Sequence, residues 1–181
     1  MLLLAGCLSN NPVENNLPSK TTEKKTSNTV PVTDTQKSTP PVQTAQLTYE
    51  EGNVTGVADG DTIKVSVSGV IHTVRYIGVD TPETKHPTIA VECFGPEADA
   101  FNRKTVLGKI VRMEKDVSDT DTYGRLLRYV YVENQMVNEV LVREGYATAT
   151  TYPPDVKYQT RFEKAEDAAQ TEEKGLWNAC T

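Results

Sequence analysis

The chain has 181 residues, with 19 Lys and Arg against 25 Asp and Glu, and a net charge of −6. Hydrophobic residues make up 37% of it and aromatic residues 7%, which suffices for one compact core but hardly for two. The acidic balance excludes a protein that binds nucleic acid through a broad basic face.

The N-terminus, Met-Leu-Leu-Leu-Ala-Gly-Cys, resembles the end of a bacterial lipoprotein signal, in which Leu-Ala-Gly precedes the cysteine that receives the lipid. We therefore expect residues 1–7 to be a truncated signal and Cys7 to be the lipidation site. The six residues before Cys7 carry no positive charge and only a short apolar stretch, so the true start is expected upstream. The alternative is a chance leucine-rich N-terminus. No other stretch approaches membrane-spanning length.

Residues 8–46 are rich in Thr, Ser, Asn, Pro, Lys and Gln, with no apolar periodicity and no aromatic residue. Such a segment cannot bury enough surface to offset its ordering entropy, and we predict a disordered linker. The folded domain then covers 47–181 and carries 15 basic against 22 acidic residues. We expect it to bind polyanions weakly at long range and to rely on a bound cation and a few arginines.

Alternating apolar residues at 62–68 and 70–77, with Gly69 between them, predict two strands joined by a tight turn. Further strands are predicted at 53–58, 109–115 and 125–133. Five strand segments suit a small closed barrel.

Three helices are predicted between and after these strands. Pro96 suits a first helical position and Gly108 a helix end. The other two helices carry apolar stripes that end at Gly145 and Gly175. The stripes consist of Val137, Val140 and Leu141, and of Tyr158, Phe162, Ala165 and Ala169. Strands followed by a helix, strands and helices predict an α+β domain with a five-stranded antiparallel barrel.

Carboxylates gather in two segments, Asp-Gly-Asp-Thr at 59–62 and Val-Asp-Thr-Pro-Glu at 79–83. Asp61 follows a turn signal and Asp80 ends a predicted strand. Pro82 favours an extended Thr81, whose carbonyl is then a third hard oxygen ligand. Calcium accepts such mixed shells, and so few protein ligands predict a weak Ca²⁺ site, on the order of 10⁻⁴–10⁻³ M. Taken singly, each aspartate could instead be a turn residue.

The same segments supply groups for phosphodiester cleavage. Arg75 offers a planar cation that can bind a phosphate through two hydrogen bonds, and Arg125 would complete the set. Glu83 is the candidate general base that orients or deprotonates a water. The alternatives are a surface ion pair for Glu83, for example with Lys85, and ordinary strand-surface arginines.

With these residues in hand, the chain resembles the staphylococcal nuclease (thermonuclease) family over residues 53–177. Five fragments appear in the family's order: Asp-Gly-Asp-Thr, Val-Asp-Thr-Pro-Glu-Thr-Lys-His-Pro, Gly-Pro-Glu-Ala, Tyr-Gly-Arg and Met-Val-Asn-Glu-x-Leu-Val-Arg-x-Gly. The resemblance implies an OB-fold and a calcium-dependent endonuclease that cuts DNA and RNA with low sequence specificity and leaves 3′-phosphate ends. Tyr152 corresponds to a family tyrosine that packs against nucleotide, and Tyr123 precedes the Gly-Arg pair. Both are candidate substrate-binding residues, with packing on the barrel as the alternative.

Cysteine usage agrees with export. If Cys7 is lipidated, Cys93 and Cys180 remain as a pair suited to one disulfide in an oxidising compartment, with two free buried thiols as the alternative. We expect a monomer without a protein partner, either secreted or held at the cell surface by a lipid anchor alone.

Two other functions remain open. A nuclease-like OB domain can lose its metal ligands and act only as a nucleic-acid-binding module, although a binding module has no need of the full set of acidic and arginine residues. The second alternative is a surface lipoprotein whose calcium site only stabilises a loop.

Overall fold

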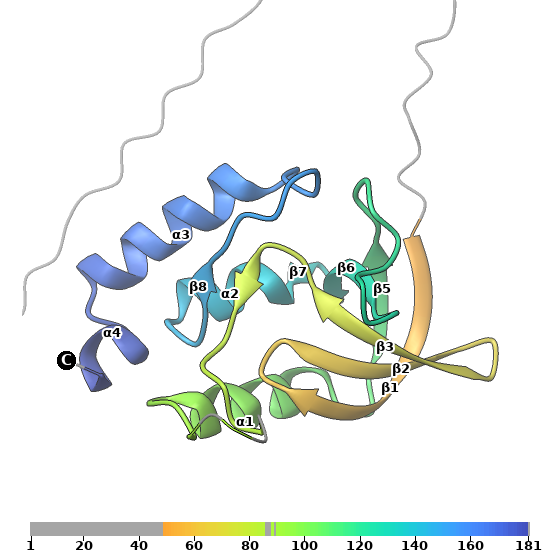
Figure 1. Cartoon of the computed structure of the whole chain (residues 1–181), viewed down its shortest axis with the longest axis horizontal. Coiled ribbons are helices and arrows are strands. Elements are labelled where there is room, and N and C mark those ends of the chain that lie inside the picture. Colours follow the sequence, from red (N-terminus) through yellow and green to blue (C-terminus); the bar gives the residue numbers. More distant parts are fainter. Residues whose placement is uncertain (1–48, 86–87, 89, 181) are drawn as a thin grey trace, which may run out of the picture. The chain divides into compact units, whose positions relative to one another are not determined.

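The computed structural model describes residues 49–85, 88 and 90–180 (Figure 1). The expected signal with Cys7 and the expected linker lie outside the described residues, as do the first residues of the expected domain. Within the described ranges, no helix combines the length and apolar character needed to cross a membrane.

Five strands form a closed barrel in the order β3-β2-β1-β5-β6, with β3 also paired to β6. They are β1 (Tyr49–Asp59), β2 (Thr62–Val67), β3 (Val70–Tyr76), β5 (Ile110–Glu114) and β6 (Leu126–Val132). All five predicted strands are therefore present. The barrel differs from the antiparallel prediction at one pairing, since β3 and β6 run parallel with Arg75 opposite Leu127. A ring of five strands cannot alternate in direction throughout, so at least one pairing must be parallel.

The apolar alternation of the strands fills the barrel. Ile63, Val65 and Val74 are fully buried. β1 serves two partners, because its residues 53–59 pair with β2 and its residues 49–53 pair with β5. At this change of partner, a Cβ on Gly52 would lie 2.4 Å from a Val65 methyl carbon, so only glycine fits.

Four helices lie within the described residues, one more than predicted. They are α1 (Gly95–Val106), α2 (Val137–Arg143), α3 (Gln159–Thr171) and the short α4 (Leu176–Ala179). Phe162, Ala165 and Ala169 of α3 are buried, as the stripe predicts. Three short strands were not predicted: β4 (Val79–Asp80) pairs with β8 (Thr148–Ala149), and β7 (Gln135–Met136) pairs with β6.

Two buried amides attach helices to the barrel. Asn138 of α2 donates to the Ile77 carbonyl at 2.9 Å and accepts the Val130 N–H at 2.9 Å. Asn102 of α1 accepts the Tyr76 hydroxyl at 2.9 Å and donates to the Asp59 carbonyl at 3.1 Å. Since these partners lie at or just beyond strand ends or within β6, each amide sets where its helix sits on the barrel.

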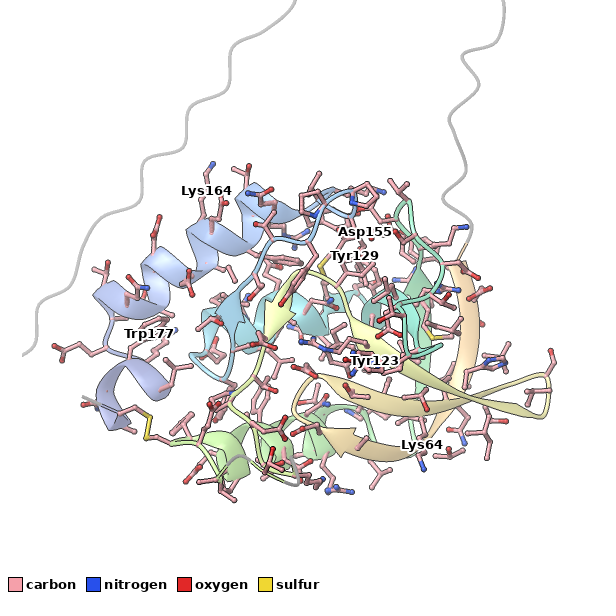
Figure 2. The ribbon with its side chains drawn as sticks, viewed as in Figure 1. Lys64, Tyr123, Tyr129, Asp155, Lys164 and Trp177 are labelled. Atoms are coloured by element: carbon pink, nitrogen blue, oxygen red, sulfur yellow. A yellow bond between two sulfur atoms is a disulfide. The ribbon has the colours of Figure 1, made fainter. Side chains whose placement is uncertain are left out.

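The predicted disulfide is confirmed. Cys93 and Cys180 are bonded across a sequence separation of 87 residues. Figure 2 shows the bond in yellow between α4 and the segment before α1. The chain-entropy model assigns about 4.6 kcal/mol to closing a loop of this length.

Replacement of Asn138 by alanine tests the attachment of α2. The Val130 N–H and the Ile77 carbonyl would lose their partner inside the core, and each unsatisfied group costs about 1–3 kcal/mol. We expect a lower free energy of unfolding, measured by urea denaturation with an unchanged m value. Asn53→Ala is the control, because the Asn53 side chain is exposed, and a change of less than about 0.5 kcal/mol is expected there. Equal losses in both variants would contradict this role of the amide.

Candidate functional site

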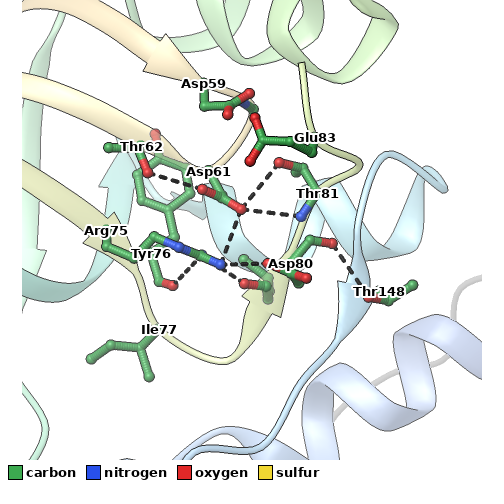
Figure 3. Close-up of polar contacts among 12 residues, drawn as sticks. Asp59, Asp61, Thr62, Arg75, Tyr76, Ile77, Asp80, Thr81, Glu83 and Thr148 are labelled. Carbon is green, nitrogen blue, oxygen red and sulfur yellow. Dashed lines mark hydrogen bonds and ion pairs between the residues drawn. The ribbon is translucent and has the colours of Figure 1, made fainter. Parts of the chain in front are cut away.

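Arg75 brings the two predicted metal carboxylates together. Its Nη2 lies 3.1 Å from Asp61 Oδ2 and 2.6 Å from Asp80 Oδ1 (Figure 3). Its Nη1 donates to the carbonyls of Tyr76 at 3.0 Å and Val79 at 2.7 Å. The guanidinium therefore fixes the turn between β3 and β4 and, with it, the position of Asp80.

Asp61 is buried, and both of its carboxylate oxygens accept hydrogen bonds. Its Oδ2 accepts both the N–H and the hydroxyl of Thr81 at 3.1 Å, and its Oδ1 accepts the Thr62 hydroxyl at 2.9 Å. These bonds hold the carboxylate in one orientation. Thr81, predicted as a carbonyl ligand, thus also orients Asp61 through its side chain.

Asp80 faces the solvent more than Asp61, with 54% of its side chain exposed. Partial burial raises the pKa of the Asp80 carboxyl, Arg75 opposes the rise, and the charges of Asp61 and Glu92 add to it. Burial is therefore the main cause of the raised pKa of Asp80, and Arg75 limits the rise.

The donor set fits a calcium ion. Two carboxylates meet at one guanidinium nitrogen, and calcium prefers such hard oxygen ligands. Among the described residues, no three His, Cys, Asp or Glu side chains group as a metal site. A cation at Asp61 and Asp80 would therefore also need the Thr81 carbonyl and water, which agrees with weak binding.

Glu83 lies on the loop that follows β4. Its Oε1 accepts the N–H groups of Thr84 at 2.9 Å and Lys85 at 2.7 Å. Figure 3 shows its carboxylate directed toward Asp59, on the same side of the site as Asp61. The alternative role for Glu83 was a surface ion pair with Lys85. The ammonium group of Lys85 instead lies 3.4 Å from Asp99 Oδ1.

Asp59 belongs to the site although sequence reasoning gave it no role. Its Oδ1 accepts the Gly60 N–H and the Thr84 hydroxyl, both at 2.9 Å, which joins the end of β1 to the loop of Glu83. Burial raises the pKa of Asp59, these hydrogen bonds oppose the rise, and Asp61 and Glu83 add to it. Its signal in the sequence is the first aspartate of Asp-Gly-Asp, which also fits a simple turn.

A cleft of about 510 Å³ lies beside Arg75. Its lining includes both predicted arginines and both predicted tyrosines, namely Arg75, Arg125, Tyr123 and Tyr152. Tyr123 is 84% exposed and Tyr152 60% exposed, so their rings are open to a ligand. Arg75 contacts the carboxylates and also lines this cleft.

Arg125 is held by its own loop. Its Nε lies 2.6 Å from Asp121 Oδ2, and its guanidinium carbon lies 5.4 Å from the centre of the Tyr123 ring. Burial alone would raise the pKa of Asp121, but the hydrogen bonds and charge of Arg125 lower it overall. Asp121 therefore stays ionised and keeps the guanidinium beside the cleft.

Asp155 joins the two walls of the cleft, and sequence reasoning missed it. The carboxylate is buried, and its Oδ1 accepts the N–H groups of Val117 at 3.0 Å and Ser118 at 2.7 Å. It thereby connects the turn that carries Tyr152 to the loop that leads to Tyr123. In the sequence, an aspartate after Pro-Pro indicates only a turn. Its hydrogen-bond donors lie 37 and 38 residues away, so no local pattern reveals them.

Comparison with known proteins matches residues 73–179 to the family described as staphylococcal nuclease homologue. The chain is 44% identical over 122 residues to a thermonuclease of Staphylococcus hyicus, covering 67% of this chain and 72% of that protein. It is 38% identical over 183 residues to endonuclease YncB of Bacillus subtilis, covering 98% of this chain and 86% of that protein. The SPbeta prophage-derived endonuclease YokF of the same species is 44% identical over 122 residues, which span 41% of its length.

Removal of the Asp155 carboxylate tests the link between the walls. Asp155→Ala leaves the Val117 and Ser118 N–H groups without their acceptor, and we expect the free energy of unfolding to fall by about 1–3 kcal/mol. Asp155→Asn keeps an acceptor oxygen and should lose less. Urea denaturation compares the three proteins. An alanine variant as stable as the parent would refute the link.

Proposed function

Since this chain belongs to the staphylococcal nuclease family, we propose that it is an endonuclease that hydrolyses phosphodiester bonds of DNA and RNA with low sequence specificity. Several relatives bear the names thermonuclease or endonuclease. The observation that carries the proposal is the placement of Arg75, which contacts the Asp61 and Asp80 carboxylates and also lines the cleft of Arg125.

The cleft suits a single strand of nucleic acid. Two arginines in its lining can donate to the phosphate, and Arg donors match phosphate geometry better than Lys. The exposed rings of Tyr123 and Tyr152 offer faces on which bases stack. Stacking tolerates any base, because every base has a π face, and this supports low sequence specificity for both DNA and RNA.

We propose Ca²⁺ as the cofactor, held by the carboxylates of Asp61 and Asp80 and the carbonyl of Thr81. When bound, the ion supplies positive charge that neutralises the phosphate and polarises its oxygens. The protein's part is to keep the two carboxylates in place, which Arg75 and Thr81 do through the hydrogen bonds described above.

In the proposed reaction, Glu83 accepts a proton from a water that attacks phosphorus. Arg75 and Arg125 donate hydrogen bonds to the phosphoryl oxygens, where negative charge grows in the transition state. The bond between phosphorus and the 5′ oxygen breaks, and this oxygen takes up a proton. The products are a 3′-phosphate and a 5′-hydroxyl.

We further propose that the protein acts outside the cell as a monomer, anchored by lipid at Cys7 or secreted. The Cys93–Cys180 disulfide supports this location, because such bonds persist in oxidising compartments and are rare in the cytosol. The Leu-Ala-Gly-Cys sequence at 4–7 supports the anchor. A weak calcium site also functions best where calcium is at millimolar concentration.

Calcium removal tests the cofactor. The full chain is incubated with single-stranded DNA in millimolar Ca²⁺ and then with excess chelator. We expect cleavage with Ca²⁺ and its loss with chelator, restored when Ca²⁺ is added back. End-labelling of the products then tests for 3′-phosphate termini. Cleavage that persists in the chelator would overturn the calcium proposal.

Glu83→Gln separates a catalyst from a binding module. We expect kcat to fall by about 10²–10⁴-fold, the usual worth of a general base, while the Kd for a short single strand changes little. Glu97→Gln, an exposed acid on α1, removes the same charge and serves as control. A parent chain that binds single strands without cleaving them would favour the binding module, and calcium that raised only the melting temperature would favour a structural calcium site.

A further inference from the structure

One residue, Glu92, binds both polar groups of the Glu83 backbone. Its Oε2 accepts the Glu83 N–H at 2.8 Å, and its own N–H donates to the Glu83 carbonyl at 2.9 Å. Glu83 and Glu92 lie nine residues apart at the two ends of one loop. The Glu83 backbone therefore follows wherever Glu92 is held.

The start of α1 packs directly against the same backbone. A Cβ on Gly95 would lie 3.1 Å from the carbonyl oxygens of both Pro82 and Glu83, so the helix approaches closer than most side chains allow. The Gly95 N–H also donates to the Glu92 carbonyl at 3.1 Å. Glu92 is thus connected both to Glu83 and to the first residue of α1.

The residue that follows Glu92 carries the disulfide. Cys93 is bonded to Cys180, which follows α4. The start of α4 is tied to the turn that follows α2, because the Leu176 N–H donates to the Gly145 carbonyl at 2.9 Å. A hollow of about 380 Å³ is lined by both cysteines and by Asp80, Thr81 and Glu92, which places the covalent link beside the proposed metal ligands.

We propose that Glu92 and the Cys93–Cys180 disulfide together act as a positioning unit for Glu83. The disulfide fixes the main chain at Cys93, Glu92 passes this constraint to the Glu83 backbone through two hydrogen bonds, and the Glu83 carboxylate is thereby kept in place for water activation. This inference rests on the proposed nuclease function. It assigns Glu92 no contact with substrate.

The physical reason is the accuracy that proton abstraction requires. A displacement of about 1 Å can cost on the order of 10²-fold in rate, and a loop anchored only by hydrogen bonds between exposed groups opens readily. Glu92 and Cys93 are both exposed, so burial of these two side chains does little to hold this end of the loop. The covalent bond at Cys93, one residue from Glu92, restrains the main chain there instead.

The test compares Glu92→Ala, Glu92→Gln, the double variant Cys93→Ser with Cys180→Ser, and the control Glu97→Ala in the full chain. Steady-state kinetics on single-stranded DNA at saturating Ca²⁺ give kcat and KM, at a temperature where circular dichroism shows each variant folded. Amide hydrogen exchange of Glu83, followed by NMR, reports on the backbone independently of activity. A Ca²⁺ titration gives metal affinity.

We expect Glu92→Ala to lower kcat by on the order of 10²-fold, with KM within about twofold and faster exchange at the Glu83 amide. Glu92→Gln should stay within about threefold of the parent, because its amide oxygen accepts the same N–H. The double cysteine variant should lower kcat by about 3–10-fold, part of the cost of misplacing the base, and also speed the exchange. Glu97→Ala should match the parent.

Unchanged kcat and exchange in Glu92→Ala would overturn the inference. Loss of Ca²⁺ affinity in both Glu92 variants would also overturn it, because Glu92 would then be a metal ligand. If the parent chain cleaves no substrate, the proposed function fails and the positioning role fails with it. If the parent and all variants cleave with the same kcat, the positioning role alone is refuted.

Discussion

The parallel pairing of β3 with β6 closes the barrel, and the arrangement of the site depends on this closure. Its register sets Arg75 opposite Leu127, two residues from Arg125. Two arginines 50 positions apart in the sequence thereby line one cleft. Closure also pairs strands that would otherwise present free edges, which in an open sheet invite association with other chains.

Acidic side chains of the site cluster around Arg75. Asp59, Asp61, Asp80 and Glu83 gather on one side of Arg75, and burial together with their mutual repulsion raises the pKa of Asp59 and of Asp80. A bound cation would relieve this repulsion. The net charge of −6 repels a polyanionic substrate at long range. The proposed metal and two arginines attract the phosphate at short range, where screening by salt is weak.

Several carboxylates hold loops of the site together through hydrogen bonds. Asp59, Glu92 and Asp155 each accept hydrogen bonds from loop N–H or hydroxyl groups, and each connects segments that carry proposed site residues. A carboxylate suits this task because it is an acceptor with several lone pairs and forms strong hydrogen bonds when ionised. Acidic residues in such a site thus divide into those proposed to contact the metal or the water and those that hold the loops.

The sequence alone determined the five barrel strands and the three longer helices, because alternation with period two and stripes at helical spacing are local properties. It also indicated Asp61, Arg75, Asp80, Glu83 and Arg125 through motifs, and the Cys93–Cys180 bond through cysteine count. Only the tertiary structure decided the parallel closure, the β4–β8 pairing and the contacts of Asp155 and Glu92. The reason is that a hydrogen bond to an N–H group distant in sequence depends on how packed elements meet, and a short acidic or turn segment carries no local trace of its partner.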